Sequence, residues 1–145
     1  MTASAVAQPN IALIKYWGKR DVARNLPAVG SLSVTLESLQ TQMSVDFDAT
    51  DRDSLQVNGR DAPDMLGRVT RCLDLVAGND RPAAAVSSAG NFPIGAGLAS
   101  SAAAFAALAV AANAAANAGH DRLALARIAG ASSGSAARSL YGGLV

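Results

Sequence analysis

The sequence has only one cysteine, Cys72, and few aromatic residues. A lone cysteine excludes an internal disulfide and argues against a cysteine-ligated metal cluster, so we expect no resident metal and a reducing, cytoplasmic environment. Aromatic residues make up 4% of the chain and apolar residues 50%. We therefore expect one domain whose core is built from small side chains.

Strong charge of either sign is also missing, since the formal net charge is +1 and both signs are scattered. This excludes the basic surface that a nucleic-acid backbone requires, so we expect small-molecule partners. Gln8, Pro9 and Asn10 interrupt the N-terminal apolar run, which argues against a signal peptide. Residues 98–118 carry no charge but are mostly alanine, which favours a buried helix over a membrane span.

Hydrophobic patterning predicts strands in the first third of the chain. Apolar runs cover residues 5–7 and 10–16, and residues 32–36 and 43–47 alternate with the period of half-buried strands. Asn58-Gly59, directly after residues 55–57, predicts a hairpin turn.

Helical spacing takes over later in the chain. Apolar residues from 66 to 76 predict a helix with Gly78 as its C-cap, and Asp121 is a good N-cap for a later helix. Between them we expect a strand at residues 83–86 and a long helix at residues 99–118. Residues 132–135 should open a short helical turn that Gly142-Gly143 ends, and residues 144–145 resemble a strand start. We infer an α+β domain spanning residues 1–145 whose C-terminal part is missing from this chain.

The run PIGAGLASSA, from Pro93 to Ala102, predicts a phosphate-binding loop that leads into a helix. Gly95 and Gly97 let backbone N–H groups approach an anion without a Cβ in the way. Ser100 and Ser101 then fall in the first helical turn, where free N–H groups and the helix dipole attract a phosphate. No Gly-Lys-Ser/Thr follows, so this is not a Walker loop.

A second cluster of hydroxyls surrounds Gly134 and predicts a second anion site. Arg138 comes one turn after Ser135, and its planar guanidinium suits a carboxylate or a phosphate. Read alone, these residues also fit N-capping serines beside a surface arginine.

Three cations, Lys15, Lys19 and Arg20, lie close together in the sequence beside Tyr16. If a strand ends near Tyr16, a turn at Gly18 can direct Lys19 into a cleft; the alternative is a solvated basic strand end. Two anion sites and these cations suggest two anionic ligands, such as a nucleotide and a diphosphorylated carboxylic acid.

Three motifs together resemble a known family. PIGAGLASSA is similar to the phosphate motif of the GHMP kinase superfamily, whose N-terminal domain has a mixed or antiparallel sheet covered by helices. Two further segments closely resemble the mevalonate diphosphate decarboxylases: PNIALIKYWGKRD at residues 9–21, followed by NLP and SLSVTL, and SGSAARSLYGG at residues 133–143. The resemblance extends from Ala5 to Val145.

The resemblance implies a lyase of isoprenoid biosynthesis. With ATP and Mg²⁺ it would convert mevalonate 5-diphosphate to isopentenyl diphosphate, releasing ADP, phosphate and carbon dioxide. Arg138, holding the substrate carboxylate, and Lys15, neutralising phosphate charge, would be the catalytic residues. The implied ATP-binding residues are Pro93, Gly95, Ala96, Gly97, Leu98, Ala99, Ser100 and Ser101. The implied substrate-binding residues are Asn10, Tyr16, Trp17, Gly18, Lys19, Ser133, Gly134, Ser135, Ala136, Ala137 and Arg138.

The sequence departs from the family pattern in places. Ile94-Gly95 stands where Thr-Ala is usual, and Ala137 where Cys or Ser is frequent. The family's catalytic aspartate lies in a C-terminal half with no counterpart here, so we expect the 145-residue chain alone to lack the group that orients or deprotonates the substrate hydroxyl. A related small-molecule kinase, a mevalonate monophosphate decarboxylase and an inactive nucleotide-binding fragment stay open as alternatives, as does a homodimer.

The remaining chemically distinctive residues receive structural interpretations. We expect His120 to be a surface loop residue and Cys72 to be a small packing residue in a helix. The acidic residues at positions 46, 48, 51 and 53 lack the glycine and glutamate of an EF-hand, so we expect a solvated strand end and turn.

Overall fold

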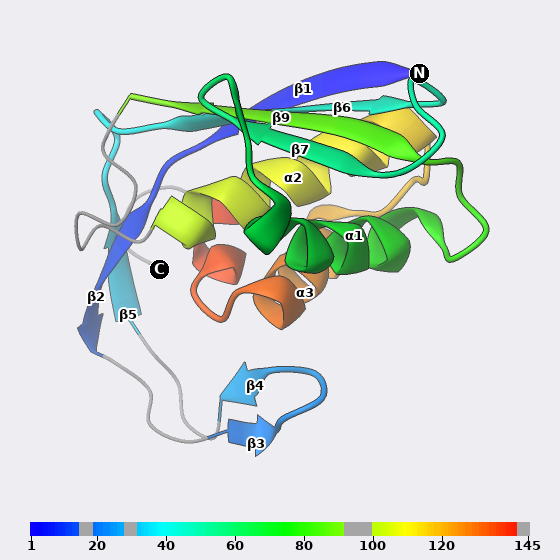
Figure 1. Ribbon diagram of the computed structural model, residues 1–145. Coiled ribbons are helices and arrows are strands. Elements are labelled where there is room, and N and C mark those ends of the chain that lie inside the picture. Colours follow the sequence, from blue (N-terminus) through cyan, green and yellow to red (C-terminus); the bar gives the residue numbers. More distant parts are fainter. Residues whose placement is uncertain (15–18, 28–31, 92–99, 142–145) are drawn as a thin grey trace.

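A computed structural model describes residues 1–14, 19–27, 32–91 and 100–141. Its strands are β1 (Thr2–Ala7), β2 (Asn10–Ile14), β3 (Lys19–Asp21), β4 (Leu26–Pro27), β5 (Leu32–Thr35), β6 (Thr41–Phe47), β7 (Ser54–Val57), β8 (Arg60–Asp61) and β9 (Ala84–Gly90). The helices are α1 (Pro63–Ala77), α2 (Ser100–Ala116), α3 (Arg122–Ser132) and the 3-10 helix η1 (Ala136–Leu140). The main sheet lies over the helices (Figure 1), which confirms the predicted α+β class.

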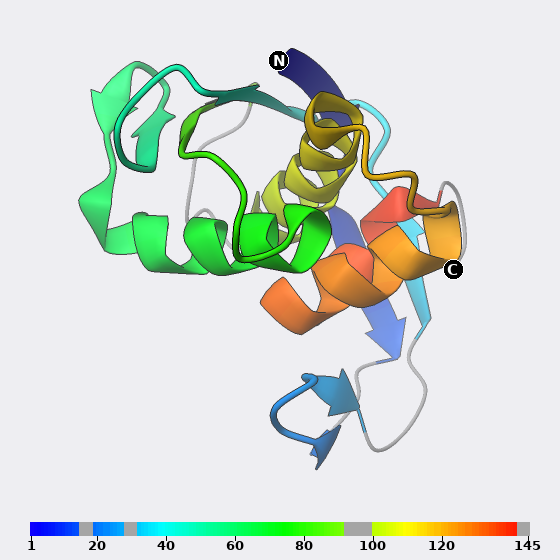
Figure 2. The ribbon, with the colours of Figure 1, turned by 90° about the vertical axis from the view of Figure 1, so that its right-hand side faces the viewer.

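The main sheet is mixed and buries one face against the helices. Its strand order is β1-β6-β9-β7-β8, and all neighbours are antiparallel except β7 and β9. Val45 pairs directly with Val86, and both are buried together with Met43 and Phe47. Figure 2 shows the three α-helices on the same side of this sheet. The apolar face therefore forms one half of the core.

α2 forms the other half of the core, and alanine allows its close packing. It contacts β1 and β6 on the sheet and also α1, α3 and η1. Its fully buried alanines are Ala102, Ala103, Ala106, Ala107, Ala109, Ala111 and Ala112. Small side chains let five elements approach one helix closely. The predicted buried helix is confirmed, and no helix in the described part of the chain is long and apolar enough to cross a membrane.

Local end signals also lie where the sequence places them. Gly78 caps α1 in the left-handed region, with φ 88°, and its N–H donates to the carbonyl of Asp74 over 2.9 Å. Asp121 caps α3 by accepting from the N–H of Ala124 over 2.8 Å. Asn58 and Gly59, with φ of 50° and 80°, turn β7 into β8. These predictions are confirmed.

β5 buries the polar half of its alternating pattern. Ser33 is 1% exposed and Thr35 9%, whereas Val34 is only half-buried. On the antiparallel partner β2, Asn10 lies opposite Thr35 and is buried, while Ile11 on the other face is 46% exposed. This strand pair is separate from the main sheet, and β5 lies against η1. The usual apolar-inward arrangement is reversed because the inner face meets a polar helical turn.

The helical turn predicted to open at residues 132–135 begins later. Ser132 is the last residue of α3, and its hydroxyl donates to the carbonyl of Ile128 over 3.2 Å. The N–H of Ser133 still donates to the carbonyl of Ala129, so the serines end one helix before η1 starts at Ala136. The predicted end at residues 142–143 and the strand at residues 144–145 lie outside the described residues.

Two residues expected at the surface are tied into the structure. Asp53 is not solvated, because it pairs with Arg81 and its side chain is only 14% exposed. His120 is half-buried, and its ring donates from Nε2 to the carbonyl of Val76 over 2.8 Å. Cys72 is fully buried, as expected of a packing residue, and this burial raises the pKa of its thiol to about 11.

Candidate functional site

The two motifs that the sequence assigns to separate anion sites meet in the structure. Ser101 lies in the first turn of α2, and Ser133 caps the C-terminal end of α3. Their hydroxyl oxygens are 3.2 Å apart. Ser133 is 8% exposed and Ser101 is half-buried, so the contact is largely removed from water.

The backbone at Ser133 differs from the expected anion site. Its N–H is committed to the carbonyl of Ala129 over 2.8 Å, so it has no free N–H to offer an anion. The Ser133 side chain therefore supplies a hydroxyl only. Ser135 lies directly before η1, and its side chain makes no capping hydrogen bond to this helix.

Asn10 joins β2 to the turn that follows Ser133. Its side-chain amide donates to the carbonyl of Ser135 over 3.0 Å and to the hydroxyl of Ser139 over 2.7 Å. Both amide hydrogens are thereby used, and the residue is 2% exposed. Its Oδ1 is buried and has no hydrogen-bond partner among the described residues. That oxygen can accept a bond from a hydroxyl group brought by a ligand.

Sequence reasoning missed the polar face of β5. Thr35 donates from its hydroxyl to the carbonyl of Tyr141 over 3.2 Å, which ties β5 to the end of η1. The hydroxyl of Ser33 is buried without a partner in the described part of the chain. The signal was present as alternating serine and threonine, but period two alone does not say which face is buried.

The other substrate-motif residues lie on η1 or shortly before it. Arg138 is half-buried, and its backbone N–H donates to the carbonyl of Ser135 over 3.3 Å. Gly134 and Ala137 are half-buried, and Ala136 is fully buried in the core. Arg138 is thus held on a short helix that α2 and α3 both support.

Several predicted site residues lie outside the described ranges. These are Lys15, Tyr16, Trp17 and Gly18, and the loop residues Pro93, Gly95, Ala96, Gly97, Leu98 and Ala99. Lys19 is the first residue of β3, and Ser100 is the first residue of α2.

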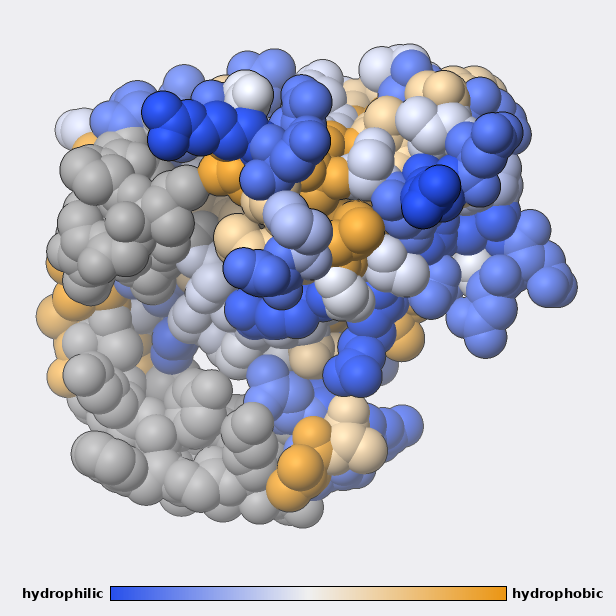
Figure 3. All heavy atoms as spheres, viewed as in Figure 1, coloured by the Kyte–Doolittle hydropathy of each residue, from blue (hydrophilic) through white to orange (hydrophobic). Residues whose placement is uncertain are grey.

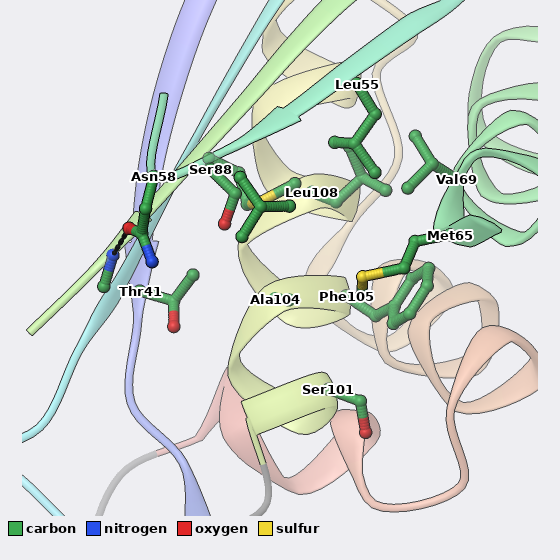
Figure 4. A pocket seen from close by; sticks show the side chains of 13 residues that line it. Thr41, Leu55, Asn58, Met65, Val69, Ser88, Ser101, Ala104, Phe105 and Leu108 are labelled. Atoms are coloured by element: carbon green, nitrogen blue, oxygen red, sulfur yellow. Dashed lines mark hydrogen bonds between the residues drawn. The ribbon is translucent and has the colours of Figure 1, made fainter. Parts of the chain in front are cut away.

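An apolar pocket of about 70 Å³ lies beside the first turns of α2 (Figure 4). Phe105 and Met65 project into it from α2 and α1, and Ser101 lies at its lower edge. The whole lining consists of Thr41, Met43, Leu55, Val57, Asn58, Met65, Val69, Ser88, Gly90, Ser101, Ala104, Phe105 and Leu108. Figure 3 shows hydrophobic atoms gathered near the middle of the corresponding face, with hydrophilic atoms around them. The lining is mainly apolar, with Thr41, Asn58, Ser88 and Ser101 as its polar members.

Arg68 links this pocket to the serine contact. Its guanidinium lies 4.7 Å from the centre of the Phe105 ring, in a cation–π contact. The same group donates to the carbonyl of Ser132 over 2.8 Å. Because Ser132 precedes Ser133, Arg68 holds the end of α3 beside the wall of the pocket.

A family model for the diphosphomevalonate decarboxylase-like N-terminal domain matches residues 7–145. The chain belongs to this family. A diphosphomevalonate decarboxylase of Eremothecium gossypii is 45% identical over 165 residues, covering 99% of this chain and 40% of the relative. The chain spans about two-fifths of the length of the curated relatives that it matches. The family resemblance predicted from the three motifs is thereby confirmed.

Solved structures of this family share the fold. A mevalonate diphosphate decarboxylase from Enterococcus faecalis matches with a TM-score of 0.91 and 40% identity, covering 99% of this chain and 46% of the other. Another solved structure is described as MDDEF in complex with MVAPP, AMPPCP and magnesium. It matches with a TM-score of 0.90 and 40% identity, covering 99% of this chain and 45% of the other. The predicted GHMP kinase type of fold is confirmed, and an ATP analogue with magnesium is bound within the family.

The described residues near the contact between Ser101 and Ser133 offer hydroxyl oxygens to a magnesium ion. In the described part of the chain, no three His, Cys, Asp or Glu side chains lie close enough together to bind a metal ion. The hydroxyls of Ser101 and Ser133 are the oxygens at the meeting point. Mg²⁺ is commonly bound through substrate phosphates with few protein ligands, and this donor set fits that arrangement.

Proposed function

We propose that this chain supplies the nucleotide-binding and substrate-binding part of an ATP-dependent decarboxylase. The reaction is conversion of mevalonate 5-diphosphate to isopentenyl diphosphate, with ADP, phosphate and carbon dioxide as the other products. The approach of Ser101 to Ser133 carries the proposal, because it joins the phosphate-loop helix to the substrate motif. Membership of the diphosphomevalonate decarboxylase-like family supports it.

The substrate occupies the side of the site built by β2, β3 and η1. Ser133, Ser135 and Lys19 bind its diphosphate, together with Tyr16 and Gly18. Asn10 and Trp17 shape the pocket, and the buried Oδ1 of Asn10 accepts a bond from a hydroxyl of the substrate. The backbone from Gly134 to Ala137 forms the floor below it.

Arg138 binds the substrate carboxylate in this arrangement. A guanidinium on η1 can hold a carboxylate through two parallel hydrogen bonds, which fixes its orientation. Lys15 neutralises phosphate charge between the two ligands. The contribution of both residues is positioning and charge neutralisation rather than covalent chemistry.

The nucleotide occupies the loop and the apolar pocket. Residues 93–101 surround its phosphates, with Mg²⁺ neutralising phosphate charge when bound. The base enters the pocket, because that pocket begins at Ser101 and offers apolar walls with Thr41 and Asn58 as polar groups. This places the phosphates at the N-terminal end of α2, where the helix dipole favours anions.

The reaction proceeds in two steps. The γ-phosphoryl group of ATP passes to the tertiary 3-hydroxyl, which loses its proton, and ADP is formed. The bond between the carboxylate carbon and C2 then breaks, and its electron pair forms the new double bond as phosphate leaves C3. Carbon dioxide and isopentenyl diphosphate result. Because the chain spans only part of its relatives, we assign the proton acceptor to a residue outside these 145.

The test is to assay the full-length gene product with ATP and mevalonate, its 5-phosphate or its 5-diphosphate. We expect isopentenyl diphosphate and carbon dioxide from the diphosphate alone, with one ADP for each turnover. Arg138→Ala should abolish carbon dioxide release while ATP still binds in a calorimetric titration. Nucleotide binding without any product from the diphosphate would refute the proposal, and turnover of the monophosphate would favour the related decarboxylase instead.

Other assignments stay predictions. Activity of the isolated 145-residue chain would contradict our placement of the proton acceptor. We also propose a cytoplasmic location, and sedimentation can check whether the protein forms a homodimer.

A further inference from the structure

The C-terminal end of α3 is held by two side chains from distant parts of the chain. The last carbonyl groups of a helix have no intrahelical partner, so they accept bonds from elsewhere. Arg68 donates to the carbonyl of Ser132, and the side-chain amide of Asn25 donates to the carbonyl of Gly130 over 2.8 Å. Asn25 lies 105 residues before Gly130 in the sequence. The segment that carries Ser133 is therefore fixed by contacts that the helix itself does not supply.

Asn25 belongs to the turn of the β3–β4 hairpin. Its φ of 55° is in the left-handed region, which asparagine tolerates better than most residues. Its N–H donates to the carbonyl of Val22 over 3.2 Å, and the N–H of Arg24 donates to the Asp21 carboxylate over 3.1 Å. The turn is thus closed by its own hydrogen bonds. The side chain of Asn25 is left to act outside the turn.

That side chain connects the hairpin to the helices. The hairpin lies beneath α3 in both views (Figures 1 and 2). Among residues 21–25 of the hairpin, Asn25 is the one whose side chain hydrogen-bonds to α3. Its Oδ1 is also buried, without a partner in the described ranges, and the residue as a whole is half-buried.

We propose that Asn25 is a positioning residue for substrate binding. Lys19 begins β3 and pairs with Pro27 of β4, so the position of the hairpin sets the position of Lys19. Gly130 lies in the last turn of α3, three residues before Ser133, which caps this helix. The bond from Asn25 to Gly130 thereby joins the hairpin that carries Lys19 to the helix end that carries Ser133. This role rests on the proposed function.

Two substitutions separate the side-chain bond from the turn geometry. Asn25→Gly keeps the left-handed backbone and removes the amide. Asn25→Asp keeps the size and turn preference but places a carboxylate opposite the Gly130 carbonyl. We expect the KM for mevalonate diphosphate of the full-length gene product to rise roughly threefold to tenfold in Asn25→Gly and further in Asn25→Asp. The KM for ATP should change by less than about twofold. Val22→Ala, at a 78% exposed position of the same turn, is the matched control.

Lys19 supplies the second half of the test. If Asn25 acts through Lys19, then adding Asn25→Asp to Lys19→Met should raise the KM for the diphosphate by much less than it does in the wild type. If the effects of Asn25→Asp and Lys19→Met on this KM are fully additive, the inference is overturned. Wild-type KM values in both Asn25→Gly and Asn25→Asp would also overturn it, because residue 25 would then serve only the turn.

Hydrogen exchange keeps the inference separate from the proposed function. We expect faster amide exchange in residues 19–27 of both Asn25 variants, with Val22→Ala unchanged. If the wild type does not bind mevalonate diphosphate in a titration, the proposed function fails, and exchange alone decides whether Asn25 holds the hairpin. Unchanged exchange in both variants would refute the anchoring, whatever happens to activity.

Discussion

The hydroxyl oxygens of Ser101 and Ser133 lie 3.2 Å apart, although 32 residues separate them in the chain. One belongs to the first turn of α2, which follows the proposed ATP loop, and the other ends α3 before the proposed substrate residues. This hydrogen bond therefore connects the two halves of the proposed site. Residues in direct contact are usually coupled energetically, which makes the pair testable.

Substitution of the two serines should show this coupling. We expect Ser101→Ala to raise the Kd for ATP and Ser133→Ala to raise the KM for mevalonate diphosphate, each by roughly threefold to tenfold. With the free energy of ATP binding measured for all variants, the double variant should differ from the sum of the two single changes by about 1 kcal/mol. Calorimetric titration and steady-state kinetics measure these values, with Ser87→Ala on the exposed side of β9 as control. Strict additivity would mean that the contact carries no coupling.

Filling the apolar pocket should impair nucleotide binding. Ala104 lies one turn after Ser101 and lines the pocket, so Ala104→Leu places a larger side chain where the base is proposed to bind. We expect the Kd for ATP to rise roughly tenfold, which corresponds to about 1.4 kcal/mol. Ala114→Leu, on the exposed side of the same helix, should bind ATP normally. Wild-type affinity in Ala104→Leu would place the base elsewhere.

Arg81 and Asp53 should stabilise the fold in a pH-dependent way. Arg81 donates to both carboxylate oxygens of Asp53, over 2.9 and 2.6 Å, and its side chain is 6% exposed. The hydrogen bonds from Arg81 lower the pKa of Asp53 from 3.8 to about 2. A carboxyl group whose pKa is lowered on folding stabilises the native state above its unfolded pKa. We therefore expect this contribution to be complete above pH 3.8 and to be lost as the pH falls to about 2.

Removing the guanidinium tests this interpretation. Arg81→Met leaves the Asp53 carboxylate without its cation, so we expect a loss of roughly 3 kcal/mol in the free energy of unfolding at neutral pH. Arg81→Lys should recover only part of it, since an ammonium group cannot bind Asp53 in bidentate fashion and reach Asp74 as well. Thermal unfolding followed by circular dichroism between pH 7 and 2 is the measurement. If the difference in unfolding free energy between wild type and Arg81→Met does not become smaller below pH 3.8, the stabilisation does not come from the ion pair with Asp53.

The sequence predicted those features that depend on neighbouring residues. Gly78, Asp121 and Asn58-Gly59 act within one turn of the chain, so their effect on the backbone can be inferred locally. The small-residue composition of α2 likewise indicated a buried helix. Ser101 and Ser133 were both selected from their motifs, because serines beside glycines at helix ends are a local signal for anion binding.

Local signals misled where a contact at long range changed the outcome. Asp53 was expected in solvent, but Arg81, 28 residues away, buries it in an ion pair. The serines at positions 132 and 133 were expected to open a helix, yet the hydrogen bonds of α3 continue through them. An ion pair or a continued run of helical hydrogen bonds can outweigh the weak local preference of a single residue for solvent or for a helix start.

By itself, the sequence determined the caps of α1 and α3, the hairpin turn, the small-residue helix α2 and the family, because periodicity, caps and contiguous motifs are properties of neighbouring residues. Only the tertiary structure decided that β5 turns Ser33 and Thr35 inward, since alternation defines two faces but not which one is buried. It also decided that Asn25 meets Gly130 and that Ser101 meets Ser133. Such pairings depend on how helices and strands pack around α2, and sequence spacing does not encode that arrangement.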